Sequence, residues 1–361
     1  MFENEEYEMF TTRFLTRIAT LAAVFLLALS NVQLAYATPA NDNFVDATQI
    51  TSLPFSVNAN TTGATFEADE PIPSCWWGYP LKTVWFAYTP TTNVTVTARA
   101  TYFNFPPLLA IYQGDALNNL NQMACGNYDS QHTFQAQAGD TYYFQLSSLY
   151  DWYEGIIPFS LEFTPPPEVS IYHYPDDPNI YDNVWFDAWV NDPIGIETIE
   201  WDFGDGTTSN SWALYHQFAA DGDYTVNLTA TTYDGRTGSA SRVVQVRTHD
   251  VAITSFSLPQ TARANQTRTI NVDVKNKRYS ENVEVLLIKG LPGGNERQIG
   301  ILTLYVPARA SRPTTFKFSY TFTADDATVG KVTFKAVATI VNARDALPSD
   351  NIAIGTTKVS K

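Results

Sequence analysis

The chain has 361 residues, 44% of them hydrophobic and 14% aromatic, and a formal net charge of −15. Residues 38–249 carry 24 acidic against 5 basic side chains, whereas residues 250–361 carry 15 basic against 9 acidic ones. Such an acidic first part argues against nucleic acid as a partner, because phosphate binding needs clustered Lys and Arg. The length suits two or three domains of ordinary size.

Residues 1–37 have the pattern of a cleavable signal peptide. Arg13 and Arg17 precede an apolar run, residues 18–29, which is too short to span a bilayer, and Ala35 and Ala37 offer the small side chains that signal peptidase requires. Four Glu among the first eight residues are atypical of such a segment, so Met9 is an alternative start. We expect a secreted or cell-surface protein, with no stable membrane insertion after signal cleavage.

Beyond residue 38 the apolar side chains recur with a period of two rather than 3.6, and Tyr, Phe, Thr and Val are abundant. This pattern predicts an all-β protein of three tandem β-sandwich modules, jelly-roll-like and immunoglobulin-like. We predict modules at residues 40–164, 168–248 and 250–361. Residues 165–167 are three prolines, which cannot donate to a sheet ladder and therefore indicate a stiff linker.

The first module alternates in several segments, for example at Val84, Phe86 and Tyr88. It resembles the pre-peptidase C-terminal type of bacterial β-sandwich over residues 41–44, 61–65, 83–89, 109–114 and 138–143. The family's usual Asp before the strand at 109–112 is replaced by residues 105–107, Phe-Pro-Pro, which argues against a calcium role there. Cys75 and Cys125 are predicted to form one disulfide, as expected of an exported protein.

The middle module contains the stretch Trp201 to Gly206, where an alternating strand enters a Gly-Asp-Gly turn. Glycine enters positive-φ turn positions without steric cost, and Asp caps neighbouring amides. The module resembles the PKD (polycystic kidney disease) domain, an immunoglobulin-like sandwich of extracellular proteins. The last module alternates at Ile270, Val272 and Val274 and resembles an adhesion-related immunoglobulin-like domain of bacteria over residues 272–276 and 348–351.

No catalytic motif is recognisable. The four histidines, His132, His173, His216 and His249, are in no zinc-binding helix motif, and the chain has no nucleophile elbow or P-loop. We therefore predict a non-enzyme without a cofactor. Two acidic groups are candidate Ca²⁺ ligands, because Ca²⁺ binds six to eight oxygen atoms. The alternatives are turn capping for the first group and a solvated loop for the second. The groups are Asp192, Asp202 and Asp205, and Glu67, Asp69 and Glu70 with Asn41 and Asp42.

Aromatic residues are the strongest functional signal. Because Val184, Phe186, Ala188 and Val190 take one face of a strand, Trp185 and Trp189 point the other way, and Tyr172 and Tyr174 do the same on a neighbouring strand. Such a face is a platform for stacking sugar rings, a protein-docking face, or a surface that packs against a neighbouring module. Loop aromatics of the first module offer the same choice: Trp76, Trp77 and Trp152.

These observations predict a non-catalytic, exported, multi-module protein for cell-surface adhesion or for binding an extracellular polysaccharide or surface protein. One alternative is an accessory, substrate-targeting subunit of a secreted peptidase or glycosidase system. A structural spacer is the other.

Overall fold

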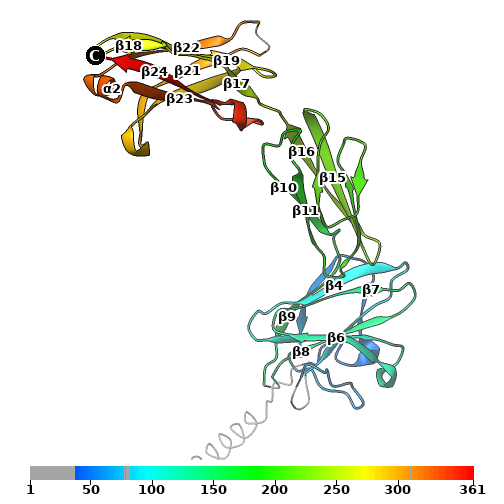
Figure 1. Cartoon of the computed structure of the whole chain (residues 1–361). Helices are drawn as coiled ribbons and strands as arrows, with labels where there is room; N and C mark the ends of the chain where they lie inside the picture. Colours follow the sequence, from blue (N-terminus) through cyan, green and yellow to red (C-terminus); the bar gives the residue numbers. More distant parts are fainter. Residues whose placement is uncertain (1–36, 77, 79–81, 151, 309–310) are drawn as a thin grey trace, which may run out of the picture. The chain divides into compact units, whose positions relative to one another are not determined.

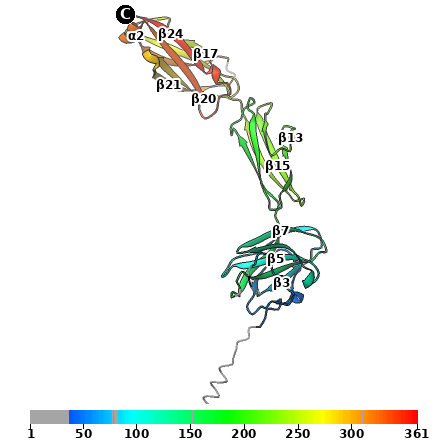
Figure 2. The same ribbon diagram turned by 60° about the horizontal axis from the view of Figure 1, so that its bottom comes forward.

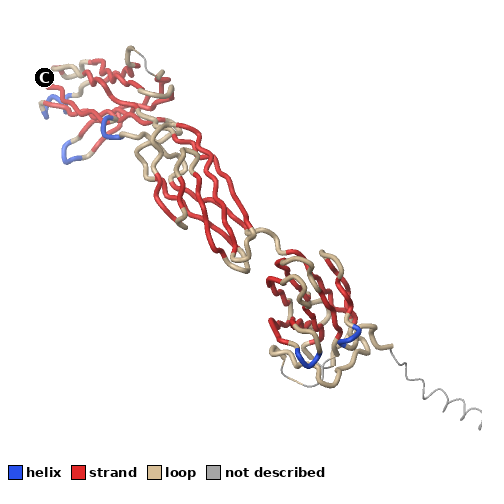
Figure 3. Tube along the Cα trace, turned by 90° about the vertical axis from the view of Figure 1, so that its right-hand side faces the viewer, coloured by secondary structure: helices blue, strands red, loops and turns tan. Residues whose placement is uncertain are grey.

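The computed structural model describes residues 37–361 apart from residues 77, 79–81, 151 and 309–310. The described chain is almost entirely strand and loop, as Figure 3 shows. It forms two compact units, of which the first ends at Pro165 and the second begins at Pro166. No helix in this described part is long and apolar enough to cross a membrane. The predicted signal peptide, residues 1–37, falls almost wholly outside the described residues.

The first unit is a sandwich of a five-stranded and a four-stranded sheet, in the orders β1-β3-β8-β5-β6 and β2-β9-β4-β7. In Figure 1, β4, β7 and β9 form one layer and β6 and β8 the other. The elements are η1 (Phe44–Asp46), β1 (Thr48–Ile50), β2 (Phe55–Asn60), β3 (Val84–Tyr88), β4 (Val94–Ala100), β5 (Pro107–Gln113), η2 (Leu117–Asn119), β6 (Asn121–Asn127), β7 (Ser130–Ala136), β8 (Tyr142–Ser148) and β9 (Ile156–Phe163).

The predicted alternation places the core between these two sheets. Val84, Phe86 and Tyr88 of β3 all belong to it, together with Phe144 and Phe159. The opposite side of β3 is also buried, because Trp85 lies in a second apolar cluster that includes Trp76. Strand β3 is therefore buried on both faces.

The second unit begins with another sandwich, made of the three-stranded sheet β10-β11-β14 and the four-stranded sheet β13-β12-β15-β16. Trp201, Phe186, Phe203 and Phe218 are fully buried between them. Figure 2 gives a second view of these strands, with β13 and β15 labelled. The strands are β10 (Glu168–Tyr174), β11 (Val184–Asn191), β12 (Ile196–Asp202), β13 (Thr208–Ser209), β14 (Ala213–His216), β15 (Gly222–Thr232) and β16 (Thr237–Val246).

A third pair of sheets completes the second unit, in the orders β17-β19-β22 and β18-β24-β23-β20-β21. Its core contains the alternating residues Ile270, Val272 and Val274 of the sequence pattern. All three pairs of sheets are sandwiches, so the predicted fold class is confirmed. The elements are β17 (Val251–Ser257), β18 (Thr261–Arg263), β19 (Thr267–Asn276), β20 (Glu281–Gly290), η3 (Pro292–Gly294), β21 (Glu296–Val306), β22 (Thr314–Thr321), α2 (Ala324–Val329), β23 (Lys331–Ile340), η4 (Pro348–Asp350) and β24 (Ile352–Ser360).

Candidate functional site

The turn after β12 sets the register of the middle sandwich. Trp201 is fully buried, and its indole N–H donates to the carbonyl oxygen of Ser211 over 2.9 Å. In the turn itself, Asp202 Oδ1 accepts from the amide of Gly204 at 2.9 Å, and Asp205 Oδ1 accepts from the amide of Thr207 at 3.0 Å. The acidic residues of this stretch therefore cap a turn, which is a structural role.

His216 belongs to the same structural group. Its Nε2 atom lies 2.8 Å from Asp205 Oδ2, and its ring stacks on Phe203 with centroids 4.1 Å apart. Burial alone would raise the pKa of Asp205, but the hydrogen bonds from Thr207 and His216 outweigh it and hold that pKa below its ordinary value. The carboxylate is thus ionised and fully engaged within the turn.

With the core side of β11 filled by Val184 and Phe186, its other side carries Trp185, Asp187 and Trp189. Pairing in the sheet places Tyr174 of β10 opposite Trp185, and Trp185 opposite Tyr215 of β14. Three aromatic side chains therefore form a row across three strands. The Trp185 and Tyr215 rings are in contact, with centroids 4.8 Å apart and planes at 60°.

We call five residues on this side of the sheet the aromatic face: Tyr172, Tyr174, Trp185, Trp189 and Tyr215. Trp189 is 55% exposed and Tyr215 68% exposed, whereas Trp185 is half-buried. Four residues along a strand separate the two tryptophans by roughly 13 Å. A flat, partly hydrated apolar surface of this extent is unusual on a protein that does not use it for contact.

The surroundings of the aromatic face are acidic. A depression of about 740 Å³ is lined by four of its rings together with Asp176, Asp177 and Asp182. On the face itself, Asp187 lies between the two tryptophans and opposite Tyr172. At the border, Arg344 of the third sandwich donates to the carbonyl oxygen of Asp177 at 3.1 Å and to Asp182, while the exposed rings stay accessible. An uncharged or cationic ligand is compatible with this surface, and a polyanion is not.

Sequence reasoning predicted four of these five residues and missed Tyr215. The alternation of apolar and outward-facing side chains in residues 213–216 could have predicted Tyr215. Leu214 packs against the core, so Tyr215 lies on the opposite face of the strand. Trp212, also missed, is exposed just before β14, and its carbonyl oxygen accepts the amide of Ala188 at 3.0 Å.

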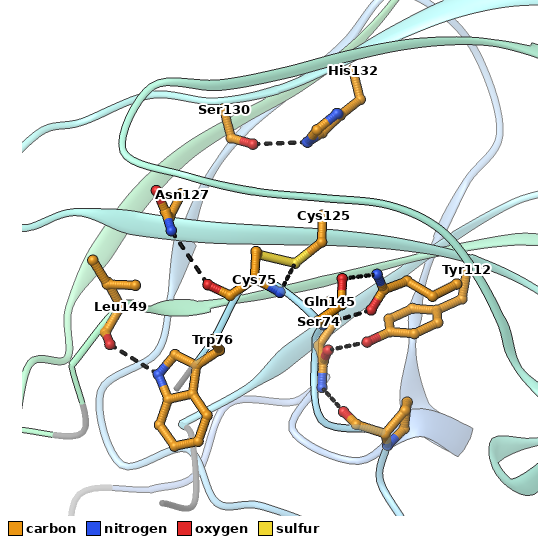
Figure 4. Close-up of a disulfide and its surroundings, with 12 residues drawn as sticks. Ser74, Cys75, Trp76, Tyr112, Cys125, Asn127, Ser130, His132, Gln145 and Leu149 are labelled. Carbon is orange, nitrogen blue, oxygen red and sulfur yellow. Dashed lines mark hydrogen bonds between the residues drawn. A yellow bond between two sulfur atoms is a disulfide. The ribbon is translucent and has the colours of Figure 1, made fainter. Parts of the chain in front are cut away.

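The loop aromatics of the first module differ from one another. Trp152 is 68% exposed, and its ring stacks on Tyr150 with centroids 4.9 Å apart. Trp76 is only 8% exposed, and its indole N–H donates to the carbonyl oxygen of Leu149 at 2.9 Å (Figure 4). The prediction of Trp76 as a surface residue is therefore corrected, because its ring packs inside the unit. Trp77 lies outside the described residues.

The disulfide prediction is confirmed. Cys75 and Cys125 are bonded, with their Cα atoms 5.6 Å apart, as Figure 4 shows. Around the bond, the amide of Cys75 donates to Cys125 Sγ at 3.3 Å, and Asn127 donates to the carbonyl oxygen of Cys75 at 3.3 Å. The bridge ties the loop that contains Trp76 to strand β6.

The predicted calcium ligands of the middle module do not converge. The carboxylate of Asp192 accepts hydrogen bonds from Nη1 and Nη2 of Arg236, both at 2.9 Å. Asp192 lies near the start of β12, whereas Asp202 and Asp205 lie at the other end of that strand. A strand of seven residues separates the two places by roughly 20 Å. A single ion therefore cannot bind all three carboxylates.

The acidic group of the first module is an internal network. Glu70 is buried, and its Oε1 atom accepts from the indole N–H of Trp85 at 3.1 Å and from Gln145 at 2.8 Å. Asp42 accepts from the amide and the hydroxyl of Thr65 at 2.6 and 2.8 Å. Burial raises the pKa of Glu70. These oxygens connect segments of the fold and are not arranged around a common point.

One pair of side chains has the types used in nucleophilic catalysis. Ser130 Oγ lies 3.0 Å from His132 Nε2 on strand β7. Ser130 is buried, however, so a substrate cannot reach its hydroxyl, and burial lowers the pKa of His132. The pair is explained as a satisfied hydrogen bond within the sandwich. A non-enzymatic role remains a prediction.

Comparisons with known proteins agree with the fold of the middle module. Residues 166–247 match the family model of the PKD domain. A microbial collagenase of Vibrio alginolyticus is 41% identical over 56 residues, which are 15% of this chain and 7% of the collagenase. The chain thus spans only a small part of that relative.

Two solved structures are similar to parts of the chain. The PKD1 domain of Vibrio anguillarum Epp is 27% identical, covering 23% of this chain and 95% of that one, with a TM-score of 0.21. The CARDB domain of the Pyrococcus furiosus PF1109 protein, in complex with di-metal ions, is 17% identical, covering 31% and 90%, with a TM-score of 0.25. The chain is a protein of tandem β-sandwiches. It contains a PKD domain at residues 166–247.

Proposed function

We propose that this protein is an exported, non-catalytic binding protein, whose aromatic face recognises an extracellular polysaccharide or surface protein. The observation that carries the proposal is the row Tyr174, Trp185 and Tyr215 across three paired strands. Rings held by a sheet lose little conformational freedom on binding, so the surface is preorganised for a flat partner. Asp187 and the acidic border favour neutral or basic ligands over polyanions.

Export is supported by two independent features. The signal-like pattern of residues 1–37 is one, and the disulfide of Cys75 and Cys125 is the other, because such bonds persist in oxidising compartments. A location outside the cytoplasm also fits a protein whose partner is a polymer or another surface protein.

The proposal is tested by retention of the full chain on insoluble chitin, cellulose, peptidoglycan and collagen. We expect one of these to retain the wild type, and Trp185→Ala/Tyr215→Ala to lower the affinity at least tenfold, because each lost stacking contact is worth about 1–2 kcal/mol. Trp189→Ala reports whether the ligand extends along β11. Tyr305→Ala, which removes an exposed ring of the third sandwich, is the matched control and should bind like the wild type.

Two outcomes would count against the aromatic face. Retention by none of the polymers would remove the polymer-binding function. Unchanged retention of the double variant, with unfolding midpoint and circular dichroism also unchanged, would place the binding surface elsewhere, with Trp152 and Tyr150 as the next candidates.

The accessory-subunit function is the second candidate, favoured by the partial identity with a microbial collagenase. It is distinguished by adding the chain to a secreted hydrolase and comparing soluble with insoluble substrate. An accessory subunit accelerates hydrolysis of the insoluble substrate alone, whereas an adhesion protein changes neither rate.

A further inference from the structure

Three carboxylates meet at one end of the third sandwich. Asp250 directly precedes β17, Asp345 lies in the loop after β23, and Asp350 ends η4. One carboxylate oxygen of each lies within 4.8 Å of those of the other two. Asp250 is about a hundred positions from Asp345 and Asp350 in the sequence, so only the packing of β17 against the loop at 341–351 brings it to them.

The three carboxylates differ in how many hydrogen bonds their oxygens accept. Each oxygen of Asp345 accepts one hydrogen bond, Oδ2 from the amide of Val251 at 2.9 Å and Oδ1 from the amide of Leu347 at 2.7 Å, which leaves a further lone pair on each. By contrast, Oδ1 of Asp250 and Oδ1 of Asp350 are both buried and accept no hydrogen bond. Asp250 is only 5% exposed as a residue. Two buried carboxylate oxygens without donors are costly unless a cation compensates them.

The neighbouring Asn351 adds a neutral oxygen of the same kind. It is 5% exposed, and its Oδ1 is buried without a hydrogen-bond donor. Its carbonyl oxygen accepts from the amide of Ala338 at 2.9 Å, which holds the residue at the start of β24. Two adjacent residues, Asp350 and Asn351, thus each have one buried side-chain oxygen without a hydrogen-bond donor.

Lys277 is the cation that the structure places at this group. Its Nζ lies 2.8 Å from Asp250 Oδ2 and 3.8 Å from Asp350 Oδ2. One ammonium neutralises one of three negative charges, and it contacts the oxygens that are not the unsatisfied ones. The lysine side chain is 58% exposed, so turning into solvent would give up its ion pair with Asp250 but uncover little of the lysine itself.

The donor set selects the kind of cation. All the available ligands are oxygens, which suit hard divalent ions rather than zinc or copper. Opposite ligands of Ca²⁺ are at most about 5.2 Å apart, and those of Mg²⁺ about 4.2 Å, given their usual bond lengths. The three oxygens lie within 4.8 Å of one another, which is inside the span of a Ca²⁺ coordination shell, and the looser geometry that Ca²⁺ accepts suits ligands from separate segments.

We propose that Asp250, Asp345 and Asp350 form a Ca²⁺ site with Asn351 Oδ1 as a further ligand, and that Lys277 replaces the ion when calcium is scarce. Binding would fasten the loop at 341–351 to the first strand of the third sandwich. This role is independent of the aromatic face.

The test is calorimetric titration of the chelator-treated full chain with CaCl₂, together with thermal unfolding. We expect saturable binding by the wild type and a rise of about 5 °C in one unfolding transition at 100 times Kd. Asp350→Asn should weaken binding at least tenfold. Lys277→Gln should bind several-fold more tightly, because it removes the competing ammonium. Asp325→Asn, which removes an exposed carboxylate on α2, is the matched control and should bind like the wild type.

The outcomes separate the proposal from a simple ion pair. Absence of calcium binding by the wild type would overturn it even if Lys277→Gln binds, since the lysine would then be the permanent counter-ion. Equal affinity of Asp350→Asn and the wild type would also overturn it. If Asp350→Asn fails to fold, Lys277→Gln still decides, because unchanged or weaker affinity contradicts competition between lysine and metal.

Discussion

At the residue scale, the third sandwich contains a buried ion pair. Lys289 and Asp326 are both buried in the third sandwich and form an ion pair. Tyr320 joins them, accepting from Lys289 Nζ at 2.9 Å and donating to Asp326 Oδ2 at 2.7 Å. Asp326 also closes the capping box of α2 with Thr323, so this cluster connects a strand to the start of a helix.

The pH dependence of this cluster follows from its pKa shifts. Burial would lower the pKa of Lys289 and raise that of Asp326, but their hydrogen bonds outweigh burial and shift both pKa values the other way. The contribution of Asp326 is therefore present above its ordinary pKa of 3.8 and is lost as the pH falls through its lower folded value. That of Lys289 is present below pH 10.5 and is lost as the pH rises through its higher folded value.

Lys289→Met tests the cluster. It leaves Asp326 buried without its cation, and we expect a loss of about 3 kcal/mol in the free energy of unfolding at pH 7. The loss should shrink towards pH 4, where Asp326 can take up a proton. Urea unfolding at both pH values measures this, and Lys289→Met/Asp326→Asn should recover part of the loss. An equal loss at both pH values would mean that packing, not charge, is responsible.

At the element scale, two glycines shape the turn that follows β12. Gly204 has φ = 73° and Gly206 has φ = 91°, so both occupy the region that favours glycine. Their surroundings differ, because a Cβ on Gly204 would lie 2.6 Å from the carbonyl oxygen of Thr225, whereas a Cβ on Gly206 meets nothing within 4 Å. The first glycine therefore allows β15 to approach closely, and the second only shapes the turn.

We expect Gly206→Ala to cost about 1 kcal/mol, from backbone conformation alone, and Gly204→Ala about 3 kcal/mol, because a backbone clash is added. Chemical denaturation of the two variants measures the difference, with Gly206→Ala as the matched control. Equal losses would show that the contact with Thr225 relaxes without cost.

At the scale of the whole molecule, the chain consists of two units with separate cores, and the disulfide belongs to the first of them. Cys75 and Cys125 are 50 residues apart, so the bond removes much of the freedom of the unfolded chain there. The other unit has no part in this closed loop. We therefore expect the effect of the bond to be confined to one unfolding transition.

Cys75→Ala/Cys125→Ala should destabilise the first unit by about 2–4 kcal/mol, which corresponds to roughly 10 °C or more in its melting temperature. The transition of the second unit should not move. Differential scanning calorimetry of the full chain separates the two, and reduction of the wild type should reproduce the result. A shift of both transitions would mean that the units unfold together.

Much of the fold follows from local pattern. Alternation in β11 and β19 predicted correctly which residues enter the core, because successive side chains of a strand point to opposite faces whatever surrounds them. The same rule placed Trp185 and Trp189 on the outer face. The pairing of Cys75 with Cys125 follows from there being two cysteines in a chain that is predicted to be exported.

The sequence by itself determined the fold class, the PKD pattern of the middle module and the outward direction of its tryptophans, since each depends on neighbours along the chain. Only the tertiary structure decided that Tyr215 completes the aromatic row, that Trp76 is buried, and that Asp250 meets two carboxylates from a distant loop beside Lys277. Those outcomes depend on strand pairing and loop packing between residues far apart in sequence. A periodic pattern tells which side of a strand a residue occupies, but not what covers that side.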